Sequence, residues 1–292
     1  MSSVGPDLMF SEEDFRLVRD LIHDNCGLSF ESDVGSILAR RLAKRLAFLG
    51  IRDFRGYYQL LKYGRDREQE FSELMDLLTT NETYFFREIF QLRALTDEVI
   101  PDLLQRRGKN SGEKPLRIWS AGCSTGEEPY TVAMLLLETG CVKGVPVEII
   151  GTDISHRVLQ QARRGVYGDS AFRATDEYYR RKYFRHEGDG FRIIDAVRDL
   201  VTISHLNLLD EARAALISGV DIILCRNVMI YFDRPVRVRV AEVFYRALRE
   251  GGYLLLGHAD SLMNITTAFV LRHLVNDMVY QRPSPTLGTD HA

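Results

Sequence analysis

The chain has 292 residues, of which 45% are hydrophobic and 27% are charged, a composition that predicts one or two folded domains and excludes a disordered chain. The formal net charge of −3 excludes the general basic field on which non-specific nucleic-acid binding depends. The longest apolar runs, such as Val220–Cys225, are far shorter than the roughly 18 residues that a membrane-spanning helix requires, so we expect no membrane span. Residues 1–10 lack the basic head and apolar centre of a signal peptide, and the expected location is the cytoplasm.

Cysteine and histidine are scattered along the chain. The histidines show no HExxH or HxH spacing, and there is no CxxC pair among the four cysteines, which are Cys26, Cys123, Cys141 and Cys225. We therefore expect reduced thiols and no metal site.

The N-terminal part of the chain has the pattern of successive helices. Ser11 precedes three acidic residues, as is typical of a helix N-cap, and this first helix is expected to end near Cys26–Gly27. A second helix is expected from Ser32–Asp33 to Gly50, with leucines at helical spacing along one face. Two more helices are predicted over residues 54–63 and 67–78.

The other face of the second helix is basic. Its positive side chains are i,i+4 neighbours with no acidic residue among them: Arg40, Arg41, Lys44 and Arg45. Such a face can bind an acidic partner, and it can equally be an ordinary solvated surface.

From Lys114 onward, short apolar runs alternate with helical patterns, which predicts an open α/β sheet. The expected strands are 116–120, 147–152, 200–205, 221–225, 252–256 and 277–281, and the expected helices are 128–138, 155–164, 209–217 and 235–248. Residues 167–198 interrupt this alternation and predict a small inserted helix and hairpin. A flexible tail is expected after Gln281.

The segment Ala121–Pro129 follows the first predicted strand and leads into a helix. Its small residues would let a ligand approach the backbone, at the end of the sheet where open α/β folds bind nucleotides. Asp153 ends the next strand, where an acid can accept hydrogen bonds from a ribose diol. The loop lacks GxGxxG, and Glu127 and Glu128 would repel a pyrophosphate, so the cationic adenosine cofactor S-adenosylmethionine fits better than a dinucleotide. Taken alone, the loop could also be a structural turn.

Five motifs together resemble those of the bacterial chemotaxis receptor methyltransferases, the CheR family. In chain order they are Thr79–Glu88, Ser124–Tyr130, Asp153–Ile154, Asn207–Leu209 and Cys225–Phe232. The resemblance implies transfer of the methyl group of S-adenosylmethionine to glutamate side chains on the cytoplasmic helices of chemoreceptors. The products would be glutamate methyl esters and S-adenosylhomocysteine.

The resemblance also implies a domain organisation. Residues 1–88 would form an all-helical domain that docks on the receptor. Residues 89–282 would form a Rossmann-like α/β methyltransferase sheet with a small β-subdomain inserted at about 167–198, and residues 283–292 would form the tail.

The cofactor contacts are likewise implied by the resemblance. They are Asn81, Thr83, Arg87, Glu127, Asp153, Asn207, Leu208, Arg226 and Asn227. Arg87 would grip the methionine carboxylate, while Glu127 would lie near the amino group and Asp153 on the ribose. Asn207 and Leu208 would flank the adenine. Arg226 and Asn227 would line the floor beneath the methyl group. Four of these positions also have a structural alternative. Arg87 could be a surface charge after an aromatic anchor, and Leu208 could be a core side chain. Glu127 and Asp153 could be an ordinary first-turn helix acid and a strand-end cap.

Tyr231 is the candidate catalytic residue. The family motif would place its phenol beside the reacting methyl group, where it could orient the incoming carboxylate, and the alternative is a half-buried aromatic residue that ends a strand. His258 is expected to be a hydrogen-bonded loop residue. A glutamate side chain has a pKa of about 4.3, so the acceptor is already ionised at neutral pH and needs no general base. Alignment and exclusion of water would then dominate the rate acceleration.

The implied partner is a glutamate-bearing receptor helix, with the basic face of the second helix as its docking site. The segment Tyr183–Phe191 is a few residues shorter than in family members that bind a receptor's C-terminal pentapeptide, which predicts independence from that tether. Two other functions stay open. One is a small-molecule methyltransferase, and the other is a non-catalytic signalling adaptor on the same fold.

Overall fold

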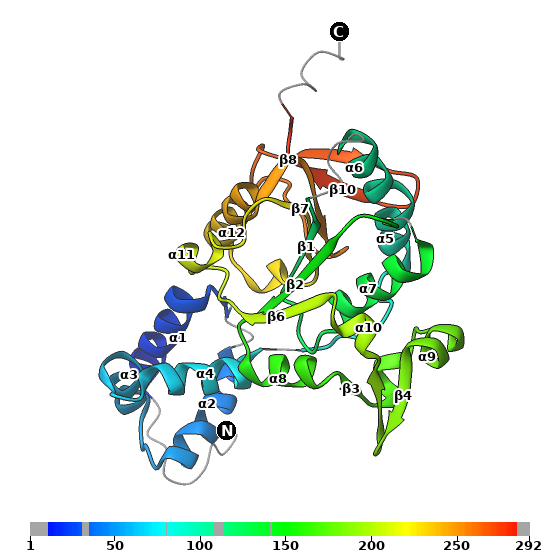
Figure 1. Cartoon of the computed structure of the whole chain (residues 1–292). Coiled ribbons are helices and arrows are strands. Elements are labelled where there is room, and N and C mark those ends of the chain that lie inside the picture. Colours follow the sequence, from blue (N-terminus) through cyan, green and yellow to red (C-terminus); the bar gives the residue numbers. More distant parts are fainter. Residues whose placement is uncertain (1–10, 31–34, 80, 108–113, 141, 285–292) are drawn as a thin grey trace. The chain divides into compact units, whose positions relative to one another are not determined.

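The computed structural model describes residues 11–30, 35–79, 81–107, 114–140 and 142–284 (Figure 1). Contacts divide the chain into two compact units. One comprises Met1–Thr80 with Tyr231–Val236, and the other comprises Asn81–Ile230 with Arg237–Ala292. Within the described residues, no helix is long and apolar enough to cross a membrane. Most of the expected tail and Cys141 lie outside the described residues.

The first unit is built from helices. They are α1 (Glu12–Cys26), α2 (Gly35–Leu49), α3 (Phe54–Tyr63) and α4 (Arg67–Leu78). The Ser11 side chain accepts a hydrogen bond from Asp14 N at 3.3 Å, and Gly27 ends α1 in the left-handed conformation, so both predicted helix ends are confirmed. The predicted start of the second helix lies outside the described residues. The segment Tyr231–Val236 belongs to this unit through Asp233, whose carboxylate lies 2.9 Å from His23 Nε2.

The second unit contains a seven-stranded sheet in the order β6-β2-β1-β7-β8-β10-β9. The strands are β1 (Leu116–Ala121), β2 (Val147–Asp153), β6 (Val201–His205), β7 (Val220–Cys225), β8 (Leu248–Leu256), β9 (Val270–His273) and β10 (Met278–Gln281). The strands from β6 to β8 pair in parallel, and β10 is antiparallel to both neighbours. The chain reverses its direction of winding at β1 and β7, and open parallel sheets bind ligands outside the strand ends at such a point.

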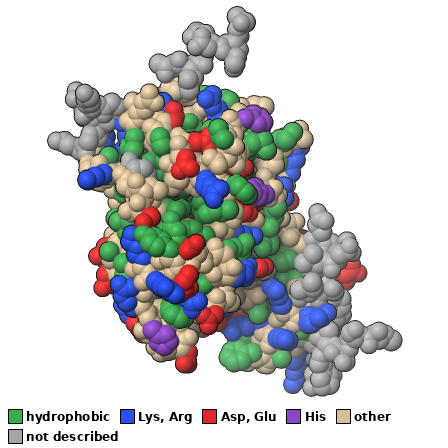
Figure 2. Space-filling view, turned by 90° about the vertical axis from the view of Figure 1, so that its right-hand side faces the viewer, with side chains coloured by type: hydrophobic (Ala, Val, Ile, Leu, Met, Phe, Trp, Pro, Cys, Tyr) green, Lys and Arg blue, Asp and Glu red, His purple; other side chains and the backbone are tan. Residues whose placement is uncertain are grey.

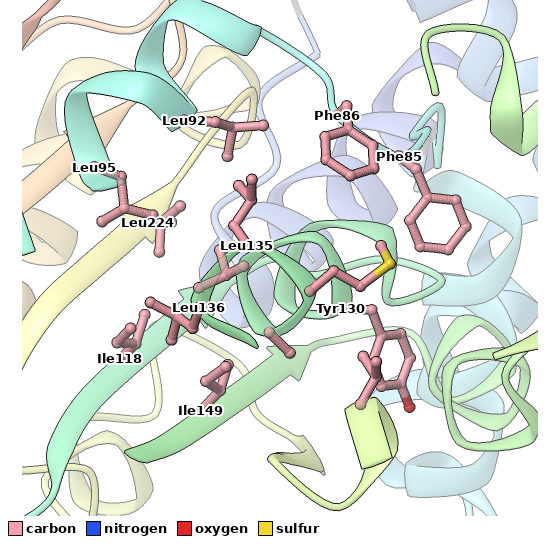
Figure 3. Packing of buried hydrophobic residues seen from close by; sticks show 14 of the residues in the cluster. Phe85, Phe86, Leu92, Leu95, Ile118, Tyr130, Leu135, Leu136, Ile149 and Leu224 are labelled. Atoms are coloured by element: carbon pink, nitrogen blue, oxygen red, sulfur yellow. The ribbon is translucent and has the colours of Figure 1, made fainter. Parts of the chain in front are cut away.

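Helices precede and connect these strands. They are α5 (Ile89–Ala94), a π-helical turn (Leu95–Val99), α6 (Ile100–Arg107), α7 (Glu127–Thr139), α8 (His156–Arg164), α10 (Asp195–Arg198), α11 (Glu211–Ala214) and α12 (Arg234–Ala247). Figure 3 shows side chains of α7, among them Tyr130 and Leu136, packed with Ile118 and Ile149 of the sheet and with Leu95. All five are buried, so α7 is fixed rigidly at the carboxyl end of β1.

The inserted β-subdomain has its own three-stranded sheet in the order β3-β5-β4. Its elements are β3 (Val166–Tyr167), a 3₁₀ turn (Asp169–Phe172), α9 (Glu177–Tyr183), β4 (Phe184–Glu187) and β5 (Gly190–Ile193). The ring of Phe85 lies 4.8 Å from Tyr167 and 5.0 Å from Phe184 between centroids, so this subdomain anchors the segment that begins the second unit.

The face in Figure 2 carries positive and negative side chains interspersed.

The predicted α/β architecture is confirmed, and each predicted sheet strand is present with small shifts at its ends. The helix predicted over residues 209–217 is shorter, covering only Glu211–Ala214. Sequence reasoning missed β9 and the helices between Ile89 and Arg107. Strand β9 is an edge strand whose four side chains are all exposed, so it has no buried face to produce an apolar alternation.

Candidate active site

The turn after β1 contains three residues in the left-handed region, Gly122 (φ 82°), Ser124 (φ 50°) and Gly126 (φ 94°). A Cβ atom at Gly122 would lie 2.3 Å from Val228 Cγ2, and one at Gly126 would lie 3.0 Å from Ala162 Cβ. The sequence predicts that small residues here make room for a ligand. At these two positions protein atoms fill the adjacent space instead, so the glycines allow neighbouring segments of the protein to pack closely against this turn.

Asp153, the last residue of β2, binds the turn after β1 through its side chain. Its Oδ2 accepts a hydrogen bond from Ser124 N at 2.9 Å, and its Oδ1 accepts one from Ser155 N at 2.9 Å. Asp153 lies at the carboxyl end of β2, where an acid can accept hydrogen bonds from a ribose diol. Leu206 N donates to the carbonyl oxygen of Asp153 at 3.0 Å, which brings the start of the Asn207–Leu209 motif beside it.

The two residues implied for the adenine differ in exposure. Asn207 is half-buried, and its Oδ1 accepts a hydrogen bond from Leu209 N at 3.0 Å, which shapes a turn. Leu208 is buried, with 8% of its surface exposed. The structure therefore places this pair at the end of β6, next to the end of β2 that carries Asp153.

Glu127 begins α7 and is the most buried acid of the turn, with 3% of its surface exposed. Its Oε2 accepts a hydrogen bond from Thr125 Oγ1 at 2.6 Å. Burial raises the pKa of Glu127 to about 7. Among the described residues, no basic side chain forms an ion pair with this carboxylate. A cationic ligand would therefore supply the missing counter-charge.

Arg226 lies at the end of β7 and is buried in a polar network. Its Nη1 donates to Glu128 Oε2 at 3.1 Å, and its Nε donates to Glu88 Oε2 at 3.3 Å. Its Nη2 also donates to the carbonyl oxygen of Arg87, and Ser120 Oγ donates to Glu128 Oε1 at 2.7 Å. Arg87 Nε also lies 4.0 Å from Glu88 Oε1, so two carboxylates face two guanidinium groups, and the network holds the turn that carries Arg87.

Arg87 follows a distorted stretch of backbone, since Phe86 and Glu88 have positive φ values of 62° and 55°. The guanidinium of Arg87 donates to the carbonyl oxygen of Glu82 at 2.9 Å and is partly exposed. The other two candidates on this segment, Asn81 and Thr83, are half-buried. The segment therefore presents its polar side chains partly to solvent, while its aromatic residues anchor it.

Asn227 is held in the left-handed conformation with φ 58°. Its backbone N donates to Asp260 Oδ2 at 2.7 Å, and burial raises the pKa of Asp260. Sequence reasoning missed Asp260, although an acid a few residues after a strand end is the same signal that identified Asp153. His258 is exposed, with its Nε2 3.3 Å from Asp277 Oδ2, in keeping with the expected loop role.

Tyr231 ends a short 3₁₀ helix, Met229–Tyr231, and 37% of its surface is exposed. Its carbonyl oxygen accepts a hydrogen bond from Ser29 N at 2.9 Å, and an isolated bridge joins Leu28 to Phe232. Tyr231 therefore belongs to the helical unit by its contacts, in contrast to the other candidates, which lie in the second unit.

The residues that the structure describes contain no group of three or more acidic, histidine or cysteine side chains placed to hold a metal ion. Three described cysteines, Cys26, Cys123 and Cys225, are buried free thiols, and burial raises the pKa of each.

A buried acidic cluster at the ends of parallel strands, with an acid as the last residue of β2, is the arrangement of an S-adenosylmethionine-dependent methyltransferase. The buried hydroxyl oxygen of Ser124 also points to a ligand, since it has no hydrogen-bond partner among the described residues. Comparisons with known proteins agree. Residues 81–276 match the family model of the CheR methyltransferase, SAM binding domain, and residues 13–79 match that of the CheR methyltransferase, all-alpha domain.

Named relatives extend over nearly the whole chain. Chemotaxis protein methyltransferase 2 of Vibrio cholerae serotype O1 is 35% identical over 279 residues, which cover 95% of each chain. The chemotaxis protein methyltransferase of Borreliella burgdorferi is 36% identical, covering 85% of this chain and 87% of its own. The chain belongs to the CheR methyltransferase family. Its predicted cofactor, S-adenosylmethionine, and its enzyme class are thereby confirmed.

Proposed function

We propose that this enzyme acts in the cytoplasm and methylates glutamate side chains on the cytoplasmic helices of chemoreceptors. The observation that carries the proposal is the match of both CheR domains in one chain, the cofactor domain and the helical domain. A small-molecule methyltransferase has no need of the helical domain. The buried acidic cluster around Glu127 supports cofactor binding, because a buried unneutralised carboxylate is costly without a ligand, and the labelling experiment below distinguishes the enzyme from a non-catalytic adaptor.

The residues present fit the cofactor. Glu127 would hold its ammonium group, and Arg87 would bind its carboxylate in fork geometry. Asp153 would accept from the ribose hydroxyls, while Asn207 and Leu208 would flank the adenine. Smaller polar contacts would come from Asn81, Thr83 and Asn227. Arg226 binds Glu88, Glu128 and the carbonyl oxygen of Arg87, so we assign it the task of positioning Arg87.

When bound, the cofactor supplies an electrophilic methyl group on a positively charged sulfur. The acidic surroundings favour that charge before transfer. The acceptor glutamate is ionised at neutral pH, so the protein has to align and desolvate it, and no side chain has to remove a proton. The phenol of Tyr231 would hydrogen-bond the incoming carboxylate.

Docking of the receptor is assigned to the basic face of α2, defined by Arg40, Arg41, Lys44 and Arg45. Two of these have internal partners. Arg41 Nη1 donates to the carbonyl oxygen of Leu78 at 2.9 Å, and Arg45 binds Glu70 through two hydrogen bonds. Arg40 and Lys44 are exposed, as is Phe48, whose ring lies 5.2 Å from Arg45 Cζ. This face suits a helix that combines acidic and apolar side chains.

Independence from a C-terminal pentapeptide is part of the proposal. The strands β4 and β5 are joined by only two residues, Gly188 and Asp189, with Gly188 at φ 58°. This tight hairpin leaves no long loop to enclose a peptide. Fusing such a pentapeptide to a receptor fragment should leave the methylation rate unchanged, and a rate increase would contradict this part of the proposal.

The function is tested by incubating the full chain with methyl-labelled S-adenosylmethionine and cytoplasmic fragments of candidate receptors. We expect base-labile label on the receptor, as carboxyl methyl esters are hydrolysed by base. Fragments with glutamine in place of the modified glutamates are the matched control and should stay unlabelled. Bound cofactor with no labelled protein in any fragment would support the adaptor instead.

A further inference from the structure

Two histidines form a parallel stack at the ends of β2 and β6. The ring centroids of His156 and His205 are 3.9 Å apart, and their planes differ by 5°. His205 Nε2 lies 3.0 Å from the carbonyl oxygen of Ile154, so this nitrogen carries the proton and donates it. This bond fixes the orientation of the His205 ring at the end of β6.

The stack joins the two chain segments implied for the nucleoside. His156 begins α8, three residues after Asp153, and His205 immediately precedes the Leu206–Leu208 segment. Asp153 and His205 are also register partners in the parallel pairing of β2 with β6. A change in the stack would therefore move the ribose acid and the adenine side chains relative to each other.

The surroundings of His205 disfavour its protonated form. Burial, followed by charge repulsion from His156, Arg213 and Arg163, lowers the pKa of His205, against the hydrogen bond to Ile154. From the neighbouring elements, Arg163 of α8 donates to the carbonyl oxygen of Ile203, and Arg213 of α11 pairs with Asp210 at 3.4 Å. Arg157 adjoins His156, and the carboxylate of Asp153 is bound by the amides of Ser124 and Ser155. Two protonated rings at this separation would repel each other.

We propose that His156 and His205 are positioning residues that clasp the two nucleoside-binding segments, and that protonation of the stack loosens the clasp and weakens cofactor binding. The proposal rests on the assignment of Asp153, Asn207 and Leu208 to the adenosine half of the cofactor. It goes beyond that assignment because neither histidine is among the residues assigned to the cofactor.

The first test is calorimetric binding of S-adenosylhomocysteine and of 5′-methylthioadenosine at pH 8. The second probe lacks the amino acid part of the cofactor, so it does not report the titration of Glu127. We expect His205→Ala to raise the Kd of both probes about threefold to tenfold, the range for loss of an aromatic pair. His273→Ala, which removes an exposed histidine of β9 at the opposite sheet edge, is the matched control and should bind as the wild type does.

The second test is the pH profile of methylthioadenosine binding between pH 8 and 5.5. The wild-type Kd should rise about fivefold or more towards pH 5.5, on the scale of tenfold for each unit of pKa difference. His156→Phe keeps an aromatic ring in the stack and removes one ionisable group, so its profile should be flatter than that of the wild type. A merely structural role would lower the affinity of His156→Phe equally at all pH values.

The outcomes distinguish the proposed role of the two histidines from the nucleoside assignment on which it rests. If Asp153→Ala abolishes binding while the histidine variants bind like the wild type with the wild-type pH profile, the clasp is refuted and the nucleoside assignment stands. If Asp153→Ala itself binds methylthioadenosine normally, the assignment fails. Circular dichroism of each variant at both pH values shows whether an affinity loss reflects unfolding.

Discussion

Two charged regions of this protein look alike in the sequence and differ in the structure. On α2, four basic side chains follow one another with no acid among them, and around the start of α7 the acids Glu127 and Glu128 stand together. Folding supplies partners to half of the first group, since Glu70 neutralises Arg45 and helix carbonyls bind Arg41. Glu127 is buried, and among the described residues its carboxylate forms no ion pair, with the Thr125 hydroxyl donating to it at 2.6 Å.

The difference shows that the role of a group of like charges depends on whether folding neutralises it. A charge that folding neutralises contributes to stability, and its removal is felt in the unfolding transition. A charge that folding buries without neutralisation lowers stability, and such a residue is retained for a ligand. The comparison makes opposite predictions for mutations in the two regions, and these can be measured on the full chain.

The largest effect is expected from Arg45→Glu. Arg45 donates to both oxygens of Glu70 at 2.9 and 2.7 Å, and Tyr57 Oη donates to the same carboxylate at 2.6 Å. Reversal would place two carboxylates together in a site where Glu70 is 5% exposed. We expect a loss of about 3–5 kcal/mol in the free energy of unfolding, measured by urea denaturation. The double reversal Arg45→Glu with Glu70→Arg should recover part of it, and a stable single variant would contradict the structural role.

Glu127→Gln should change the free energy of unfolding in the opposite direction and stabilise the protein. Because folding raises the pKa of Glu127 from 4.5 to about 7, ionisation of the folded state costs stability. The cost is absent below pH 4.5, grows as pH rises, and is complete above pH 7. Glutamine can still accept from Thr125, so the variant should be about 3 kcal/mol more stable than the wild type at pH 8 without cofactor. The gain should fall to about half of that at pH 5.5.

The same variant should bind S-adenosylhomocysteine about tenfold or more weakly, because it loses the counter-charge of the ammonium group. A gain in stability with unchanged affinity would remove Glu127 from the cofactor site. The matched control is Glu148→Gln, an acid of the same unit that pairs with Arg117 at 2.7 Å and is half-exposed, and it should alter neither property appreciably.

A smaller loss is expected for Arg41→Gln. The guanidinium of Arg41 donates to the carbonyl oxygens of Leu77 and Leu78 at 3.2 and 2.9 Å, at the end of α4, where helix carbonyls lack internal partners. Its loss should cost about 1–2 kcal/mol. Urea denaturation checks the value, and a stability equal to that of the wild type would show that water replaces the side chain fully.

The sequence predicted the fold well because its signals are local. Ser11, Gly27 and Gly50 mark helix ends through capping chemistry, and the buried strands are apolar runs. The sequence also located the acids of the turn after β1 and of the next strand end. It could not show that Arg226 binds the carboxylates of Glu88 and Glu128, because those partners are 138 and 98 residues away. For the same reason it could not separate Arg45, which is paired, from Lys44, which is exposed.

The smallest stability effect is expected for Arg40→Glu with Lys44→Glu. Both side chains are exposed, and surface charges of this kind alter stability by about 0.5 kcal/mol or less. If this face docks an acidic receptor helix, the double variant should slow receptor methylation about threefold to tenfold at low salt, with S-adenosylhomocysteine affinity unchanged. The deficit should shrink as salt is added, since screening weakens the wild-type attraction as well. Receptor methylation at the wild-type rate in low salt would instead make the face an ordinary solvated surface, and both charged regions would then be explained by folding and cofactor binding alone.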